Sequence, residues 1–248
     1  NVGGQLRIAS AWRELPVKLY IKPLWNLSPR GAMREQERLR ERVVLEDQFG
    51  EIRFVAGADL AFDPETEAAF AGVIVYRFPA LEEVERRSAR LKLQFPYVPG
   101  LLSFREGPAL AAVFARLRHE PDLILIDGHG RAHPRLFGIA CHMGVLFDKP
   151  TIGCGKSLLV GEHEMPANPA GSIAPLWFKG EKVGEVLRTR DGVRPIYVTV
   201  GHRVSLATAV EHVKGCCDGY RIPKPTRQAD HYVGELRREF QEKPRPRA

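Results

Sequence analysis

The sequence predicts an α/β fold with a mixed central sheet that is flanked by helices. Three β-rich stretches joined by short connections occupy residues 54 to 93, which is typical of an antiparallel meander. Helical and strand-like stretches then alternate through residues 107 to 154, as in βαβ units. Within them, the run Leu123-Ile-Leu-Ile126 is wholly apolar, which indicates a strand buried on both faces and parallel to its neighbour.

The part of the chain before the meander divides into an extension and a helix. Residues 1–32 have mixed composition and no clean period, so we expect an N-terminal extension. The first residue is Asn, and Met33 is a candidate alternative start. Residues 33 to 47 are strongly charged, with apolar positions at 39, 43 and 44, which predicts a surface helix.

The remaining elements follow in the order of a ribonuclease H-like fold, with three antiparallel strands and then alternating helices and strands. Strands are expected at 54–62, 70–77, 81–93, 123–126, 151–154, 181–188 and 194–200, the last two as a hairpin. Helices are expected at about 107–118 with Pro108 in the first turn, from Pro134 onward, and after the capping residue Ser205 to about 217.

Length and composition indicate one globular domain. A chain of 248 residues can bury one large core and no linker divides it, so residues 33–240 are expected to form a single domain. Residues 241–248 are rich in Pro and Arg, which predicts a disordered tail. A net charge of +7 favours polyanionic partners, nucleic acid first.

The sequence also predicts a cytoplasmic protein. The four cysteines, Cys141, Cys154, Cys216 and Cys217, have no C-x-x-C spacing and are interpreted as reduced thiols. No run approaches the roughly 18 apolar residues that span a bilayer, and the N-terminus lacks the apolar stretch of a signal peptide. We therefore expect no membrane association, and we expect a monomer.

Two aspartates end otherwise apolar runs and suggest a metal site. Asp59 ends the run that starts at Phe54, and Asp127 ends the run that starts at Leu123. A buried carboxylate without a partner costs several kcal/mol, so two of them on neighbouring strands should need a cation between them. Oxygen ligands favour Mg²⁺, which also bridges to substrate phosphates. The alternative for each acid is a salt-bridged or capping carboxylate.

Three further residues are candidates for the same site, and each has an alternative. Glu106 precedes the helix that leads to the central strand, but Ser103-x-x-Glu106 is also a capping box. His133 stands at the expected N-cap, where it would contact a phosphate or carry a proton, or be an ordinary cap or core histidine. Lys156 lacks the glycine spacing of a Walker loop, so it is either a point charge for a phosphate or a surface lysine.

An aromatic residue in a loop is a candidate for base stacking. Tyr97 lies between Pro96 and Pro99, where a rigid exposed ring would act as a wedge or stacking platform. The alternative is a tyrosine packed on a strand edge. Two other histidines, His129 and His142, are interpreted as structural.

Several long motifs resemble those of the endonuclease V family of nucleic-acid repair enzymes. They are PYVPGLLSFREGPAL, DGHGRAHPRLFGIACHMGVLFDKPTIGCGKSLL, and GHRVSLATAVE followed by PTRQAD. The resemblance runs from about Met33 to about Asp230. It implies a ribonuclease H-like DNA repair endonuclease that uses Mg²⁺, or Mn²⁺ as a substitute. It also implies cleavage at the second phosphodiester 3′ to deoxyinosine, leaving a 3′-hydroxyl and a 5′-phosphate.

The resemblance also implies roles for individual residues of the metal site. Asp59 and Asp127 would be metal ligands and Glu106 the third acid, while the fourth position falls on Asp230, next to His231. A hypothesis for the mechanism follows: the bound metal lowers the pKa of a water and stabilises the departing oxygen, and Lys156 counters charge on the phosphate.

The remaining implied roles concern the substrate. Tyr97 would fill the gap left by an extruded hypoxanthine, His133 and Lys156 would contact the scissile region, and the pocket would be lined by Pro99, Gly100, Leu102 and Gly128. Two alternatives stay open at this point. One is an endonuclease of the same fold that cleaves inosine-containing RNA, and the other is a non-catalytic nucleic-acid-binding module.

Overall fold

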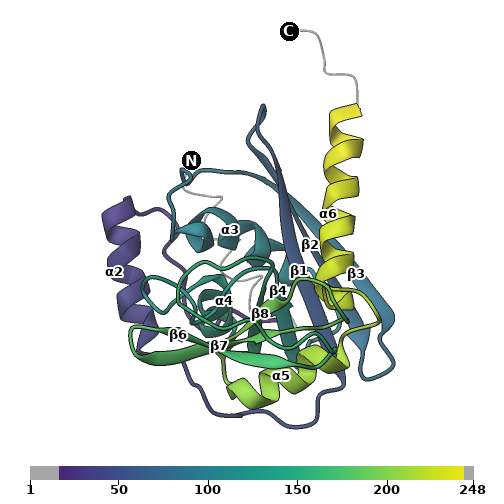
Figure 1. The fold of residues 1–248 in the computed structure, drawn as a ribbon. Coiled ribbons are helices and arrows are strands. Elements are labelled where there is room, and N and C mark those ends of the chain that lie inside the picture. Colours follow the sequence, from purple (N-terminus) through teal and green to yellow (C-terminus); the bar gives the residue numbers. More distant parts are fainter. Residues whose placement is uncertain (1–16, 243–248) are drawn as a thin grey trace, which may run out of the picture.

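The computed structural model describes residues 17–242, and its centre is one eight-stranded mixed sheet (Figure 1). The strand order is β3-β2-β1-β4-β5-β8-β7-β6. The strands are β1 (Phe54–Asp63), β2 (Ala68–Arg77), β3 (Glu82–Lys92), β4 (Leu123–Ile126), β5 (Thr151–Gly155), β6 (Ile173–Phe178), β7 (Glu181–Leu187) and β8 (Ile196–His202). Within these residues, no helix is both long and apolar enough to cross a membrane.

The strand pairing confirms the predicted sheet. β1, β2 and β3 form an antiparallel meander, and β4 pairs in parallel with β1 on one side and β5 on the other. β7 and β8 pair antiparallel, as the predicted hairpin requires. β6 was not predicted, because Pro175 interrupts its run, and proline within a strand is tolerated mainly at a sheet edge, where β6 lies.

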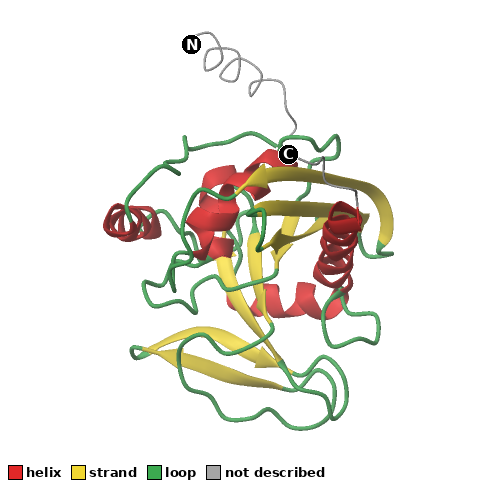
Figure 2. Ribbon diagram, turned by 90° about the horizontal axis from the view of Figure 1, so that it is seen from above, coloured by secondary structure: helices red, strands yellow, loops and turns green. Residues whose placement is uncertain are grey.

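Helices cover both faces of the sheet (Figure 2). α3 (Leu102–Phe114) and α4 (Ile139–Phe147) share one apolar core with the side chains of Ala56 and Ala58. The opposite face carries α5 (Leu206–Gly215) and α6 (Lys224–Glu242), and its core contains Val55. The mixed sheet flanked by helices is therefore confirmed.

The N-terminal helix differs from the prediction at both ends. α2 spans Pro29–Arg40 rather than 33–47, because the Ser28 side chain accepts a hydrogen bond from the Gly31 N–H at 3.2 Å and Pro29 suits the first helical turn. The expected domain boundary at residue 33 thus falls inside a helix. Residues 17–28 pack on the domain, and Val17 is only 1% exposed. Residues 1–16 of the expected extension lie outside the described residues.

Two other helix starts were predicted wrongly. α3 begins at Leu102 rather than 107, which places Pro108 inside the helix. α4 begins at Ile139 rather than Pro134, because Leu136 adopts a φ of 55° and the Gly138 N–H bonds the Gly130 carbonyl at 2.9 Å, which closes a turn. The predicted cap of α5 is confirmed, since the Ser205 side chain accepts from the Thr208 N–H at 3.3 Å.

α6 was not predicted, although it is the longest of the described helices at 19 residues. It takes up residues 241 and 242 of the expected tail, and residues 243–248 lie outside the described chain. Two glycines let α6 lie close to the sheet. A Cβ at Gly57 would lie 2.1 Å from the backbone of Pro225, and one at Gly72 would lie 2.6 Å from Cγ1 of Val233.

Candidate active site

Three charged side chains meet beside the ends of β4 and β5, next to the middle of the longer parallel strand β1. The register pairs Ala58 of β1 with Ile126 of β4, so Asp59 and Asp127 come next to each other, and Lys156 directly follows β5. Side chains along a strand point alternately to the two faces of the sheet. These three fall on the same face as the core residues that pack beneath α5 and α6. The carboxyl ends of strands are where ligands bind in α/β sheets.

Lys156 links the acid that follows β4 with an acid of α6. Its Nζ forms an ion pair with Oδ2 of Asp127 and lies 3.0 Å from Oδ2 of Asp230. Oδ1 of Asp59 accepts the backbone N–H of Leu60 at 2.7 Å. Asp230 thus joins the predicted acids, and α6 is the element that places it there.

The carboxyls perturb one another. Burial, with the adjacent charge of Asp127, raises the pKa of Asp59 to about 8 and that of Glu106 to about 8. Burial also raises the pKa of Asp127 above its ordinary value. Burial alone would lower the pKa of Lys156, but Asp127 and Asp230 raise it above the usual range. The site therefore holds more carboxyls than it can readily keep ionised.

The capping-box alternative for Glu106 is wrong. The N-cap of α3 is Leu101, without a side-chain hydrogen bond, and Ser103 lies within the helix. The Ser103 hydroxyl instead lies 2.9 Å from Nδ1 of His142, which is buried and structural, as predicted. The carboxyl of Glu106 is consequently left to the acid cluster, where the charge of Asp127 acts on it.

The donor set fits a hard divalent cation. Asp59, Asp127, Glu106 and Asp230 offer only carboxylate oxygens, which Mg²⁺ prefers, and the raised pKa values of the first three show that burial disfavours their ionised forms unless a cation is added. Between residues 17 and 242, no three His, Cys, Asp or Glu side chains are grouped closely enough to hold a metal by themselves. Mg²⁺ is commonly bound by one or two carboxylates with waters and substrate phosphates completing its shell, so a full protein cage is not required.

The metal-free chain is expected to lose stability as the pH rises from about 4 to about 8. The raised pKa of Asp59 means that the folded state holds its proton through this range, whereas the unfolded state releases it. The protonated carboxyl therefore stabilises the fold fully at low pH. Each such carboxyl loses at most about 1.4 kcal/mol of this contribution per pH unit, until the pH has risen through its raised pKa in the folded state.

Urea unfolding in EDTA at several pH values, for the wild type and Asp59→Asn, checks this expectation. The variant should show a flatter pH profile, and the difference between the two curves isolates the carboxyl from the histidines that titrate in the same range. Superimposable curves would contradict the assignment.

A pocket of about 210 Å³ adjoins the acids. Its lining contains Gly128, which follows Asp127, and Ser157, which follows Lys156. Six of the seven residues expected to bind substrate line it, namely Tyr97, Pro99, Gly100, Leu102, Gly128 and His133, while Lys156 does not. Tyr97 is 72% exposed, so the strand-edge alternative for it is wrong. Two exposed leucines that the sequence did not single out, Leu158 and Leu159, also line the pocket.

The carbonyl of Gly100 anchors the pocket loop through three donors. It accepts hydrogen bonds from Nε2 of Gln36 at 3.1 Å, from Nε2 of His133 at 3.0 Å and from a terminal nitrogen of Arg135 at 2.6 Å. Arg135 Nε also donates to Oε1 of Gln36 at 2.5 Å. The backbone at Gly100 has a φ of 76°, which glycine adopts without strain. Gln36 and Arg135 had no signal in the sequence, because each lies far along the chain from Gly100.

His133 holds this loop and is not the N-cap of α4, which is Gly138. A carbonyl can only accept and the Arg135 N–H can only donate, so the tautomer with a proton on Nε2 satisfies both contacts, the second at 3.2 Å to Nδ1. Burial lowers the pKa of His133 to about 4, so the ring is neutral at physiological pH. Both ring nitrogens are engaged, which gives His133 a positioning role in the pocket loop, and the expected phosphate contact or proton transfer stays a prediction.

Replacing Gln36 with leucine is expected to lower cleavage about tenfold and stability by about 1–3 kcal/mol, because Arg135 Nε loses its acceptor and the carbonyls of Gly100 and Phe137 each lose a donor. Cleavage rates and thermal unfolding measure the two effects. Arg34→Gln on the exposed side of α2 is the matched control. A leucine variant that unfolds early but cleaves at the normal rate would argue against a role in positioning the pocket.

Comparisons with known proteins find a family and relatives that match most of the chain. The family model described as Endonuclease V matches residues 37–231. The Endonuclease V of Roseiflexus castenholzii is 53% identical over 213 residues, which are 86% of this chain and 95% of that protein.

Solved structures agree as well. The crystal structure of the Endonuclease V of Streptomyces avermitilis matches with a TM-score of 0.84 and 40% identity, covering 89% of this chain and 98% of that one. The Endonuclease V of Ciona intestinalis was solved with a 24mer DNA containing an inosine followed by a ribo-adenosine. It matches with a TM-score of 0.72 and 27% identity, over 84% of this chain and 96% of that chain.

Proposed function

Because the chain belongs to the endonuclease V family and is therefore an endonuclease, a phosphodiester hydrolase, we propose that it cleaves nucleic acid beside deaminated adenine. The proposed cut is the second phosphodiester 3′ to deoxyinosine, leaving a 3′-hydroxyl and a 5′-phosphate, with Mg²⁺ as cofactor or Mn²⁺ as substitute. The proposed working unit is a monomer, since the acids, Lys156 and the pocket all come from one chain. Its proposed location is the cytoplasm.

One observation carries the proposal: the acid cluster and the pocket are joined through adjacent residues. Asp127 belongs to the cluster and Gly128 to the pocket wall, and the same holds for Lys156 and Ser157. A base held in the pocket would keep its own backbone close to the carboxylates. The cost of unstacking is smallest for a poorly paired base, which favours a deaminated one.

The residues of the chain then have distinct tasks. The exposed ring of Tyr97 fills the space that the extruded base leaves in the stack. The ammonium of Lys156 neutralises charge on the reacting phosphate, and the carboxyl of Glu106, with its pKa near 8, can hold or take up a proton near neutral pH. When bound by Asp59 and Asp127, with Glu106 and Asp230 beside them, the divalent cation supplies Lewis-acid stabilisation of developing charge.

The second candidate is cleavage of inosine-containing RNA. It is supported by the Ciona relative, whose bound strand carries a ribo-adenosine directly after the inosine. A 2′-hydroxyl is what distinguishes RNA from DNA at a given position, so the sugar that follows the lesion separates the two candidates.

The test is a gel assay on three end-labelled duplexes that differ only around one site: deoxyinosine followed by a deoxynucleotide, deoxyinosine followed by a ribonucleotide, and unmodified adenine. Each is incubated with Mg²⁺ or with EDTA. The proposal expects a metal-dependent nick at the second bond 3′ to the lesion and none in the unmodified strand. A clear preference for the ribonucleotide would favour the RNA candidate, and equal cutting of the unmodified strand would overturn both.

A further inference from the structure

A wide groove lies at the end of the sheet opposite the candidate active site. It has a volume of about 1280 Å³ and is lined by the loops that precede β4 and β5, by residues 18–20 and by Arg203. Asp127 follows the last residue of β4, whereas the groove loop at 115–120 precedes the first. At 13 residues, α3 spans about 20 Å between the two regions.

The groove has an excess of positive charge. Five of its lining residues are Lys or Arg and two are acidic. Each acid has a cation of its own within the groove: Lys149 lies 2.7 Å from Glu120, and Arg203 lies 2.9 Å from Asp148. The other three cations are Lys18, Arg116 and Arg118, and none of them forms an ion pair with an acid of residues 17–242. Their charge is available to an external anion.

The N-terminal segment adds an aromatic ring between cations. Along residues 17–22 the side chains alternate inward and outward, with Val17 buried and Lys18, Tyr20 and Lys22 exposed. The Tyr20 N–H donates to the carbonyl of Leu146 at 2.7 Å, which fixes the segment against α4. The ring of Tyr20 is 69% exposed and is flanked by two lysines along the same outward row.

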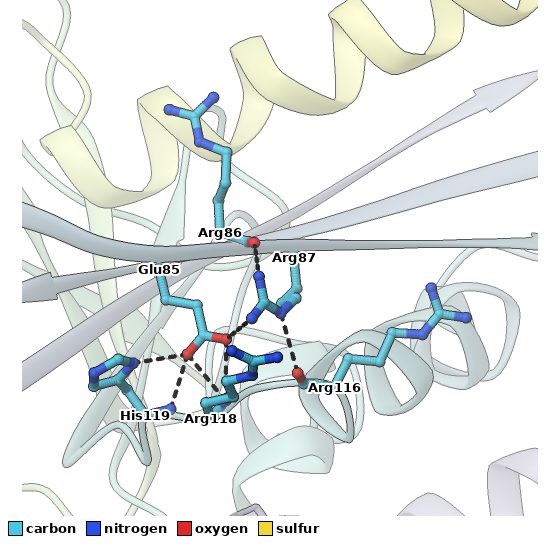
Figure 3. Close-up of polar contacts among 6 residues, drawn as sticks. All are labelled: Glu85, Arg86, Arg87, Arg116, Arg118 and His119. Atoms are coloured by element: carbon cyan, nitrogen blue, oxygen red, sulfur yellow. Dashed lines mark hydrogen bonds and ion pairs between the residues drawn. The ribbon is translucent and has the colours of Figure 1, made fainter.

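The loop that carries the two arginines is also held in place. Glu85 accepts the backbone N–H of Arg118 at 2.9 Å and of His119 at 2.8 Å, and it pairs with Arg87 at 2.8 Å. Figure 3 shows this carboxylate enclosed by its partners, with the side chain of Arg116 extending away from it. The guanidinium of Arg116 donates to the carbonyl of Ser88 at 2.6 Å, a neutral acceptor that leaves its positive charge uncompensated. Both exposed arginines therefore start from a backbone that is held in place.

We propose that this groove binds a single-stranded flank of the nucleic acid, with phosphates on Lys18, Arg116 and Arg118 and a base stacked on Tyr20. The choice of nucleic acid as the occupant rests on the proposed function. A row of cations interrupted by an exposed aromatic ring suits a strand with unpaired bases, and the groove is too wide to enclose a small anion. The family match begins at residue 37, so the segment with Lys18 and Tyr20 lies outside it.

The test measures binding of a long, lesion-free single strand to the full chain by fluorescence anisotropy in EDTA, across a salt series. Lys18→Glu/Arg118→Glu removes two phosphate contacts, and Tyr20→Ala removes the stacking platform. Lys92→Glu/Arg238→Glu is the matched control, because it reverses two exposed charges outside the groove and gives the same net charge.

The groove pair should weaken binding at least tenfold and reduce the salt slope by about 0.7 for each lost contact. Tyr20→Ala should weaken binding about tenfold with an unchanged slope. The control should resemble the wild type. Equal losses in both charge-reversal pairs, or displacement of the strand by polyglutamate at matching concentration, would overturn the proposal.

A lesion substrate with only a few nucleotides on each side separates this inference from the proposed function. Such a strand reaches the acids without reaching the groove, so the groove variants should cleave it at the wild-type rate. Slow cleavage by the variants would place the groove residues in the active site and contradict the proposal. Failure of the wild type to cleave it would count against the proposed function alone, because the binding measurement needs neither a lesion nor a metal.

Discussion

Replacing Asp127 with asparagine is expected to lower the cleavage rate by about a thousandfold while the chain stays folded. Asparagine keeps the shape of the side chain but removes the charge that pairs with Lys156 and that raises the pKa of Asp59 and Glu106. Without it, the carboxylate pair of Asp59 and Asp127 loses its capacity to hold a divalent cation. Single-turnover cleavage of a deoxyinosine duplex at saturating Mg²⁺ measures the loss.

A second readout tests the electrostatic part of this prediction. The pKa of Glu106 should move down toward its ordinary value in the variant, because the adjacent negative charge is gone. The pH dependence of residual cleavage reports this movement. Glu82→Gln, which neutralises an exposed acid on β3, should leave both the rate and the pH profile unchanged. Wild-type cleavage by Asp127→Asn would remove Asp127 from the site.

Replacing Gly57 with alanine is expected to destabilise the chain by about 3 kcal/mol and to reduce cleavage as well. The new Cβ would lie 2.1 Å from the backbone carbon and oxygen of Pro225, and backbone cannot rotate away as a side chain does. α6 must shift from β1, and it carries Asp230 away from Lys156. Urea unfolding and cleavage assays measure the two losses.

Gly72→Ala on the neighbouring strand is the matched control for this effect. Its Cβ would meet Cγ1 of Val233 at 2.6 Å, a side-chain atom that can move. The stability loss should be clearly smaller, and cleavage should be close to normal. If both variants behave alike, the close approach of α6 to β1 does not determine the position of Asp230.

The sheet and its acid pair were predictable because local patterns encode them. The alternation in residues 54–93 and the apolar run at 123–126 fix a meander and a buried parallel strand. β4 runs parallel to β1 and ends beside Ala58, which brings Asp127 next to Asp59 in the middle of the longer strand. Tyr97 was a candidate because it lies between two prolines, whereas Pro99, Gly100 and Leu102 came from the family motif and not from any pattern of hydrophobicity.

What the sequence did not show depends on contacts between distant segments. α6 is rich in charged residues, so no apolar pattern predicts it. It lies close to β1 because residue 57 is a glycine, and no local pattern reveals that contact. Gln36 and His133 meet only at the carbonyl of Gly100, across 64 and 33 residues of chain. The hydrogen bond from His133 to the Gly100 carbonyl was missed for this reason, while the predicted contact of His133 with substrate stays a prediction.

The ammonium of Lys156 forms ion pairs with Asp127 and Asp230. Binding of a metal ion to Asp127 would therefore exchange one cationic partner of this carboxylate for another. A divalent ion that binds the carboxylate of Asp127 weakens its attraction for Lys156, and the ammonium is then freer to meet a phosphate. Thermodynamic linkage makes such an effect reciprocal: a ligand that draws Lys156 away strengthens ion binding by the same factor by which the ion strengthens ligand binding. Ion and nucleic acid should therefore bind this site cooperatively, with one lysine side chain as the coupling element.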